Sequence, residues 1–473
     1  MMNAPSPAAA PVEAPEAITL AERALEAGRL DEAAGFCQQI LAKRRDDPRA
    51  THLLGQVAFR RGEFAKGIAL VERAAAAWPN DSVNSNLCEM YRLAGAFDRA
   101  VAAGQRAVAI NPGSATAHSN LGLALFERGE VDRSNACLLR AVTLDPDLAS
   151  AHLGLAHGLL IRGELRPGWL EYEWRYRVDR YKTMLPKFKR PQWNGMQVPG
   201  RLLLVGDQGF GDCIQFSRYF PQAAARCGTL LLACAGELIE LLSPLPGIAA
   251  AHDRWESVGE FTMYCPLSSL PGIFGTELDS IPAPVPYIAA KPNRVEHWRQ
   301  TLAARLPAES LRVGLVWAGR PTHGNDVRRS LTLAALQPLA DSADVAFVGL
   351  QKGKAVAQLN DFGPARVLDI SGELSSFAET AAVVANLDLV IAVDTAVAHL
   401  AGALGKPVWV MLPWLPDWRW LLDRDDTPWY PTMRLFRQPR PGDWASVITR
   451  VAGELRAVAA GDRKKLLPGL TTQ

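Results

Sequence analysis

The chain has 473 residues, of which 48% are hydrophobic and 21% charged, and its net charge is +2. This length is too great for one core and indicates two to four domains. The near-neutral balance argues against a general attraction to nucleic acid or membranes. Seven cysteines are scattered without a C-x-x-C pair, which argues against disulfides or a zinc site and favours a cytoplasmic location.

The N-terminal residues 1–16 are rich in Ala and Pro and predict a disordered tail. They carry neither the basic start nor the apolar core of a signal peptide. Further along, no apolar run reaches the roughly 18 residues that a membrane-spanning helix needs. We therefore expect a soluble protein without a transmembrane segment.

Residues 17–180 are periodic. Glycines recur every 33 or 34 residues, each followed two positions later by an apolar residue and five positions later by a small one, and prolines close the units. Glycine permits the turn between two helices, and the small residue lets them approach. The glycines are Gly28, Gly62, Gly95, Gly129 and Gly163.

This pattern resembles the tetratricopeptide repeat, and the resemblance implies an α-solenoid whose concave groove binds extended peptides or partner proteins. Polar residues recur in one register of the predicted first helices, and they are candidates for holding a protein acceptor. The alternative is that they cap or solvate those helices. The candidates are Asn84, Asn86, His118, Asn120 and His152.

The segment Arg166–Arg190 combines aromatic residues with a basic excess. We expect it to bridge the array and the next domain by packing its aromatic side chains on both. Contact with a membrane surface or nucleic acid is the alternative.

From about residue 200, strand-like runs alternate with helical patterns, which predicts parallel sheets. The Pro-rich stretch 281–286 divides this region into domains at 181–290 and 291–473, with ligands between the carboxyl ends of their strands. The predicted strands are Arg201–Gly206, Thr229–Cys234, Phe261–Cys265, Val313–Ala318, Val345–Leu350, Arg366–Ile370, Leu387–Val393, Pro407–Leu412 and Met433–Arg437.

The first of these domains opens with strand, glycine-rich loop and helix in LLLVGDQGFGDCIQFSRYF. Gly209 and Gly211 permit close approach of a ligand, and Asp212 either points into the cleft or simply caps the helix. The loop is neither G-x-G-x-x-G nor a P-loop with its lysine, so hydride and phosphoryl transfer are not indicated.

The segment LDLVIAVDTAVAHLAGAL places Asp394 and Thr395 between a strand and a helix that carries His399. The first-turn amides and the helix dipole favour a phosphate there, and Thr395 is a good N-cap. His399 lies one turn further along the same face. The pattern predicts a site for a nucleotide-type ligand.

Positive side chains for a diphosphate are expected from Arg328, Arg329 and Lys352, although the two arginines are equally typical of surface charge. Arg419, the one charged residue in an aromatic cluster, is a further candidate for a donor contact. Asp423-Arg424-Asp425 matches a metal-binding D-x-D but lies in a charged run, which favours a solvated loop. We expect neither metal nor cofactor.

The Gly211-Asp212 loop and Asp394–His399 resemble the two motifs of heptosyltransferase-type (family nine) glycosyltransferases, and with the repeats the resemblance to bacterial tetratricopeptide-repeat glycosyltransferases covers nearly the whole chain. It implies a GT-B module of two Rossmann-like domains. It also implies that Asp212 is the general base and that Asp394, Thr395 and His399 lie at the donor phosphates and sugar. Ala396 replaces the usual glycine, so heptose is not implied.

The combined prediction is an α-solenoid followed by an α/β GT-B module that acts as an inverting, metal-independent glycosyltransferase. The array would hold a protein acceptor, since the resemblance includes fusions that glycosylate bacterial surface proteins such as flagellin. Two alternatives remain. One is a repeat scaffold that binds nucleotide-sugar without turnover, and the other is a lipopolysaccharide-core transferase whose Arg166–Arg190 segment touches the membrane.

Overall fold

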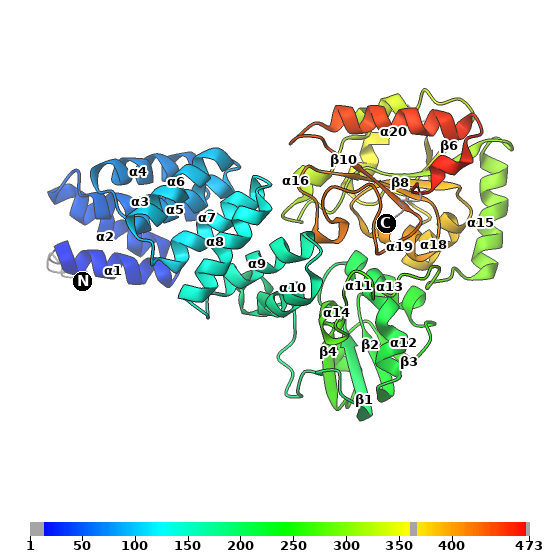
Figure 1. The fold of residues 1–473 in the computed structure, drawn as a ribbon, viewed down its shortest axis with the longest axis horizontal. Coiled ribbons are helices and arrows are strands. Elements are labelled where there is room, and N and C mark those ends of the chain that lie inside the picture. The colour runs from blue at the N-terminus through cyan, green and yellow to red at the C-terminus, as the bar shows by residue number, and fades with distance from the viewer. Residues whose placement is uncertain (1–13, 360–366, 470–473) are drawn as a thin grey trace, which may run out of the picture. The chain divides into compact units, whose positions relative to one another are not determined.

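A computed structural model describes residues 14–359 and 367–469; the tail residues 1–13 and Arg366 lie outside them. The first helix begins at Ala14, so the last three residues of the predicted disordered tail are helical instead. The chain divides into two compact units between Gly158 and Leu159. The first unit is built of paired helices and the second contains two sheets (Figure 1).

The paired helices of the first unit meet at the periodic glycines, whose φ angles of 73–84° need the freedom of glycine. This confirms the predicted tetratricopeptide-like array. The helices are α1 (Ala14–Glu26), α2 (Leu30–Lys43), α3 (Pro48–Arg60), α4 (Phe64–Ala77), α5 (Asp81–Leu93), α6 (Phe97–Ile110), α7 (Ala115–Glu127), α8 (Val131–Leu144) and α9 (Ala149–Ile161), which continues into the second unit.

Close packing explains the small residue of each repeat. A Cβ on Gly67 would lie 2.8 Å from the carbonyl oxygen of Gly55, so α3 and α4 touch through their backbones. Polar N-caps begin the first helices, as where Asp47 accepts hydrogen bonds from two amides of α3. Pro48 is the first residue of α3, so this proline starts a helix and does not end one.

The second unit continues with α10 (Leu165–Tyr172), η1 (Glu173–Arg177) and η2 (Asp179–Tyr181) and then forms a four-stranded parallel sheet of order β3-β2-β1-β4. The part that carries this sheet is the first half of the unit. Its strands are β1 (Val198–Val205), β2 (Cys227–Ala233), β3 (Ile248–His252) and β4 (Met263–Pro266). Its helices are α11 (Phe210–Phe216), α12 (Phe220–Ala224), α13 (Gly236–Leu242) and α14 (Leu270–Ile273).

The second half carries a six-stranded parallel sheet of order β10-β9-β8-β5-β6-β7. Its strands are β5 (Leu311–Val316), β6 (Val345–Gly349), β7 (Val367–Asp369), β8 (Leu389–Val393), β9 (Val408–Leu412) and β10 (Met433–Arg437). The helices of this half are α15 (Pro292–Arg305), α16 (Asp326–Arg329), α18 (Phe377–Ala385), α19 (Ala396–Ala403) and α20 (Trp444–Ala459). The apolar face of α20 packs into the core of this sheet.

Every predicted strand is present within a few residues of its expected ends, and the two parallel sheets agree with the predicted Rossmann-like architecture. The sequence prediction missed β3. This edge strand reads Ile-Ala-Ala-Ala-His and is only partly buried, so it lacks the apolar run that marked the central strands.

The strand orders locate the two points at which the chain reverses direction across each sheet. In the first half this point lies between β1 and β4, and in the second between β5 and β8. Ligands of open parallel sheets bind at the carboxyl ends of strands beside such a point. Asp212 follows β1, and Asp394 follows β8.

Candidate functional site

The first residue of the candidate site is Asp212, in the first turn of α11. Its Oδ2 accepts a hydrogen bond of 2.9 Å from the amide of Gly209, the N-cap residue. Its Oδ1 pairs with the Nη2 of Arg419. One oxygen therefore caps the helix, as one of the two interpretations predicted, while the other pairs with a residue of the second half.

Arg419 comes from a short 3-10 helix, η8 (Trp418–Trp420), in the second half. Besides Asp212, it donates to Asp417 Oδ1 at 2.8 Å and to the side-chain oxygen of Gln215. Its guanidinium lies 4.3 Å from the centre of the Trp418 ring. The sequence marks Arg419 only by its aromatic neighbours and gives no sign of the pair with Asp212.

His399 lies on α19, directly against the loop that precedes Asp212. A Cβ on Gly211 would come within 2.8 Å of the Cδ2 of His399, so the absence of a side chain allows α11 to pack on α19. The imidazole stacks on Trp420 with centroids 5.3 Å apart, and its Nδ1 lies 3.0 Å from the hydroxyl of Tyr430. Burial lowers the pKa of His399 to about 3, so the ring is neutral.

Asp394 and Thr395 lie at the start of α19, as expected. Burial, reinforced by the negative charge of Asp417, raises the pKa of Asp394 to about 6. The hydroxyl of Thr395 is buried and has no hydrogen-bond partner within residues 14–359 and 367–469. An unsatisfied buried hydroxyl is costly, so this atom is available to a ligand at the helix start.

The three predicted diphosphate-binding cations are not all at this position. Arg329 is partly buried, and its charge lowers the pKa of Asp394, so it belongs to the site electrostatically. Arg328 is exposed on α16. Lys352 is exposed as well, and its ammonium group donates to the carbonyl of Ser371 at 2.6 Å.

A buried polar cluster that the sequence does not reveal fixes the loop between β1 and α11, just before Asp212. Asp207, just after β1, accepts from the amide of Ser268 at 3.1 Å and from the hydroxyl of Tyr176 at 2.7 Å. Arg175, fully buried, donates to both Ser268 and Ser269. The bridging segment therefore anchors the glycine-rich loop through side chains that only the fold brings together.

The bridging segment also buries aromatic residues inside the second unit. The Trp169 ring packs edge-on against Trp418 at 5.1 Å, and its Nε1 donates to the carbonyl of Thr276 at 3.0 Å. Phe188 packs against Phe261 and Tyr264. These contacts agree with the packing that we expected between the segment and the domain that follows it.

The polar residues predicted to bind an acceptor are held within the array. Asn86 donates to His52 of the preceding repeat at 2.9 Å, and Asn120 donates to the carbonyl of Ser85 at 3.1 Å. His118 and His152 approach proline carbonyls just before their helices, at 3.1 and 2.9 Å. Their contacts tie neighbouring turns together, so a peptide would have to compete for them.

Asn84 differs from these four because it also lines a groove. The groove has a volume of about 580 Å³ and lies between α4 and α6 over α5. Apolar side chains form most of its surface, with Arg106 and Glu72 as charged members. Asn84 accepts a hydrogen bond from Arg106 at 3.1 Å.

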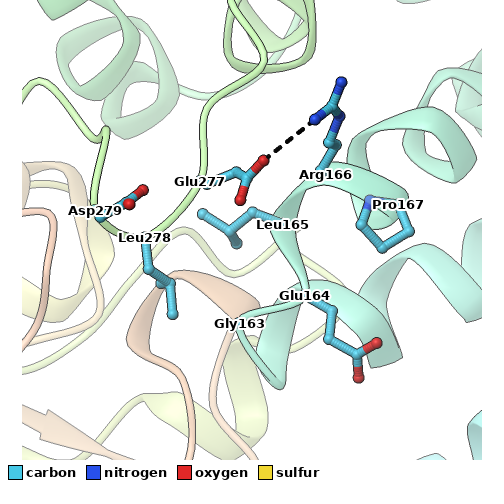
Figure 2. Close-up of a pocket in the computed structure, with 8 residues that line it drawn as sticks. All are labelled: Gly163, Glu164, Leu165, Arg166, Pro167, Glu277, Leu278 and Asp279. Carbon is cyan, nitrogen blue, oxygen red and sulfur yellow. Dashed lines mark ion pairs between the residues drawn. The ribbon is translucent and has the colours of Figure 1, made fainter.

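A second groove, of about 390 Å³, lies on the second unit (Figure 2). Residues 163–167 form one wall and residues 277–279 the other, and the walls are joined by an ion pair of 3.5 Å between Arg166 and Glu277. Figure 2 shows the side chains of Leu165 and Leu278 between these segments. None of the predicted site residues lines this groove.

The contacts described above for Asp212, Arg419 and His399 do not include the Asp423–Asp425 segment. Asp425 is largely exposed, and Arg424 pairs with Asp426 at 2.6 Å. Within the described ranges, no group of three or more His, Cys, Asp or Glu side chains is arranged to hold a metal ion. The same ranges contain no helix long and apolar enough to cross a membrane.

The two parallel Rossmann-like sheets of the second unit agree with the architecture of the GT-B class. Residues 343–410, which include Asp394, Thr395 and His399, match glycosyltransferase family 9 (heptosyltransferase). Residues 24–87 and 91–149 match tetratricopeptide repeats. The chain is therefore similar to family nine glycosyltransferases over residues 343–410 and to tetratricopeptide-repeat proteins over its N-terminal helices.

A curated relative is Protein FlbA of Caulobacter vibrioides, 28% identical over 331 residues, which cover 62% of this chain and 52% of the relative. The chain thus spans about half the length of that relative. Among solved structures, a tetratricopeptide-repeat protein of Thermus thermophilus, TTC0263, is 22% identical, with coverage of 36% here and 92% there and a TM-score of 0.32. MamA of Desulfovibrio magneticus is 18% identical, with coverage of 36% of this chain and 97% of MamA and a TM-score of 0.30.

Proposed function

We propose that the protein is an inverting, metal-independent glycosyltransferase that moves a sugar from a nucleotide-sugar to a protein acceptor held by the repeat array. One observation carries the proposal. Asp212 from one sheet and the Asp394-Thr395 helix start from the other are connected through Arg419 and through the Gly211–His399 contact. A base on one wall and an anion site on the other are what sugar transfer from a nucleotide donor requires.

The chemical step follows from this placement. An acceptor hydroxyl oxygen attacks the anomeric carbon and forms the new glycosidic bond, while its proton passes to Asp212. The bond between that carbon and the diphosphate oxygen breaks, and the nucleoside diphosphate leaves with the electron pair. Attack opposite to the leaving group inverts the configuration in one step.

The donor site is assigned to the start of α19. The amides of its first turn and the unpartnered hydroxyl of Thr395 would donate to the diphosphate, and Arg329 would supply positive charge. Because the histidine is neutral, a polar contact of His399 with the sugar would be a hydrogen bond and not an ion pair. We assign the binding of the acceptor protein to the array, where the groove beside Asn84 combines a mainly apolar surface with a few polar side chains.

A panel of nucleotide-sugars, assayed for released nucleoside diphosphate with candidate acceptor proteins, tests the proposal. We expect turnover with one class of donor, and Asp212→Asn should reduce kcat by about 10²–10⁴-fold because the proton has no acceptor. Stabilisation of Asp212→Asn by the nucleoside diphosphate should persist, since the donor site is unchanged. Full turnover by Asp212→Asn, or no release from any donor, would reject the mechanism.

A non-catalytic nucleotide-sugar binder is the second candidate, because the Asp212 carboxylate forms an ion pair with Arg419. A base held in an ion pair is a weaker proton acceptor. Thermal stabilisation by a nucleoside diphosphate, without transfer from any donor, would favour this candidate.

A further inference from the structure

Arg419 is a buried cation on which two carboxylates meet. Asp212 reaches it from α11 in the first half, and Asp417 reaches it from the segment before η8 in the second. The third partner is the side-chain oxygen of Gln215, also on α11. All three nitrogens of the guanidinium are therefore used, two of them toward α11.

Such an arrangement is rigid. The planar fork fixes the direction of each hydrogen bond, and Trp418 covers one side of the fork at 4.3 Å. Arg419 is only 7% exposed, so its interactions are weakly screened by solvent and salt. Losing Arg419 itself would leave two neighbouring carboxylates without their shared cation.

The environment of Asp212 explains why it needs this partner. Its neighbours include the carboxylates of Asp417 and Asp207, the hydroxyl of Tyr172 and the amide of Gly209. Burial is the largest influence and raises the pKa of Asp212, the two carboxylates raise it further, and Arg419 opposes them. Without the guanidinium, a carboxyl group in this position would be protonated nearer to neutral pH and unable to accept a proton.

We propose that Arg419 is the positioning residue of the transfer reaction: it holds the Asp212 carboxylate, ionised and aimed at the donor end of the second half. The proposal rests on the proposed function, because it assumes that Asp212 is the base. It extends that function to a residue that lies outside both glycosyltransferase motifs, in the segment 417–420. Asp417, which lies in the same half as Arg419, accepts a hydrogen bond from the guanidinium and so helps to fix its position.

The test is the pH profile of kcat/KM for the full-length protein with its best donor and acceptor. The acid limb of this profile is the fall of kcat/KM at low pH, where Asp212 becomes protonated. In Arg419→Gln this limb should move to higher pH by about one to three pH units, because a neighbouring cation that lowers the pKa of Asp212 is removed. Asp417→Asn should move the same limb downward, because a neighbouring anion is removed. These opposite shifts would not follow from a merely structural role of either residue.

Arg424→Gln is the matched control. Arg424 also pairs with a carboxylate two residues away, Asp426, but it does not contact Asp212. The acid limb of the Arg424→Gln profile should stay at the wild-type pH. A lowered amplitude with an unshifted limb in Arg419→Gln would overturn the proposal while leaving the proposed function standing, whereas absence of wild-type turnover with every donor would reject the proposed function itself.

A second measurement holds even if Arg419→Gln is poorly active. The urea midpoints of Asp212→Asn, Arg419→Gln and the double variant should be non-additive, with the double variant losing less than the sum of the single losses. Additive losses would show that the two side chains do not interact, and would equally overturn the proposal.

Discussion

The contact between Gly211 and His399 offers the sharpest test of how the two halves are joined. Gly211→Ala adds one methyl group whose carbon would lie 2.8 Å from His399 Cδ2, 3.4 Å from Nε2 and 3.5 Å from the Cα of Ala396. The 2.8 Å distance to His399 Cδ2 is shorter than an ordinary carbon contact, so an atom must move. The imidazole cannot yield easily, because Trp420 stacks on it and the Tyr430 hydroxyl lies 3.0 Å from its Nδ1.

We expect the substitution to destabilise the second unit by about 1–3 kcal/mol, the usual cost of forcing an extra carbon into a packed site. Turnover should fall as well, because a displaced α11 carries Asp212 away from Asp394. Gly453→Ala is the matched control, since Gly453 is exposed on α20 and a Cβ added there would meet no atom within 4 Å. That variant should instead be stabilised by about 0.5–1 kcal/mol, the gain of replacing glycine inside a helix.

Urea unfolding followed by tryptophan fluorescence is the suitable assay. Trp78 is the one tryptophan of thirteen that precedes residue 159, so the signal reports mainly on the second unit. This selectivity matters because a chain of two units need not unfold in one transition. A wild-type midpoint and wild-type turnover for Gly211→Ala, beside a stabilised Gly453→Ala, would refute the described packing of α11 on α19.

Two further predictions concern pH and the array. The pKa of His399 is about 3 in the folded protein against 6.5 for the free side chain, so the unfolded chain binds the extra proton and stability falls as pH drops from about 6.5 toward 3. His399→Gln should therefore show a shallower loss of the urea midpoint over this range, and an unchanged slope would contradict the burial of a neutral imidazole. Gly67→Ala should destabilise the array by about 1–3 kcal/mol, because its Cβ would meet the backbone of α3. Far-UV circular dichroism during unfolding measures this, with Gly35→Ala, whose Cβ meets nothing within 4 Å, as the variant that should not be destabilised.

The sequence predicted what depends on short-range patterns. The periodic glycines need positive φ at a helix–helix turn, and that requirement repeats in every unit, so the array could be read directly. The central strands could be read because they are buried on both faces and therefore continuously apolar. The edge strand β3 has no such pattern, since its alanines serve a partly exposed position.

The sequence could indicate Asp212 and the Asp394-Thr395 helix start for a related reason. Each follows a buried strand directly, and the carboxyl end of a parallel strand is where side chains become available to ligands. Neither position revealed its partner. The contact of Arg419 with Asp212 spans 207 residues, and that of Arg175 with Ser268 spans 93, so no local spacing encodes either.

The same reasoning explains why the predicted cations were only partly informative. Arg328 and Arg329 are adjacent and chemically identical, yet Arg328 is exposed, whereas Arg329 is partly buried and its charge lowers the pKa of Asp394. Which of two neighbouring side chains faces a site depends on the local turn, here the four-residue helix α16. The sequence therefore shows that two adjacent arginines are present, but it does not show which of them is near the site.

Two buried arginines, one in each half of the second unit, form a contact with the opposite half. Arg218 on the first half donates to the carbonyl of Trp429 at 2.8 Å, and Arg419 on the second half donates to Asp212. Separating the halves would remove from each guanidinium its partner in the other half and would expose it to solvent. Asp212, the proposed base, and the start of α19, the proposed donor site, therefore belong to one arrangement of the two halves.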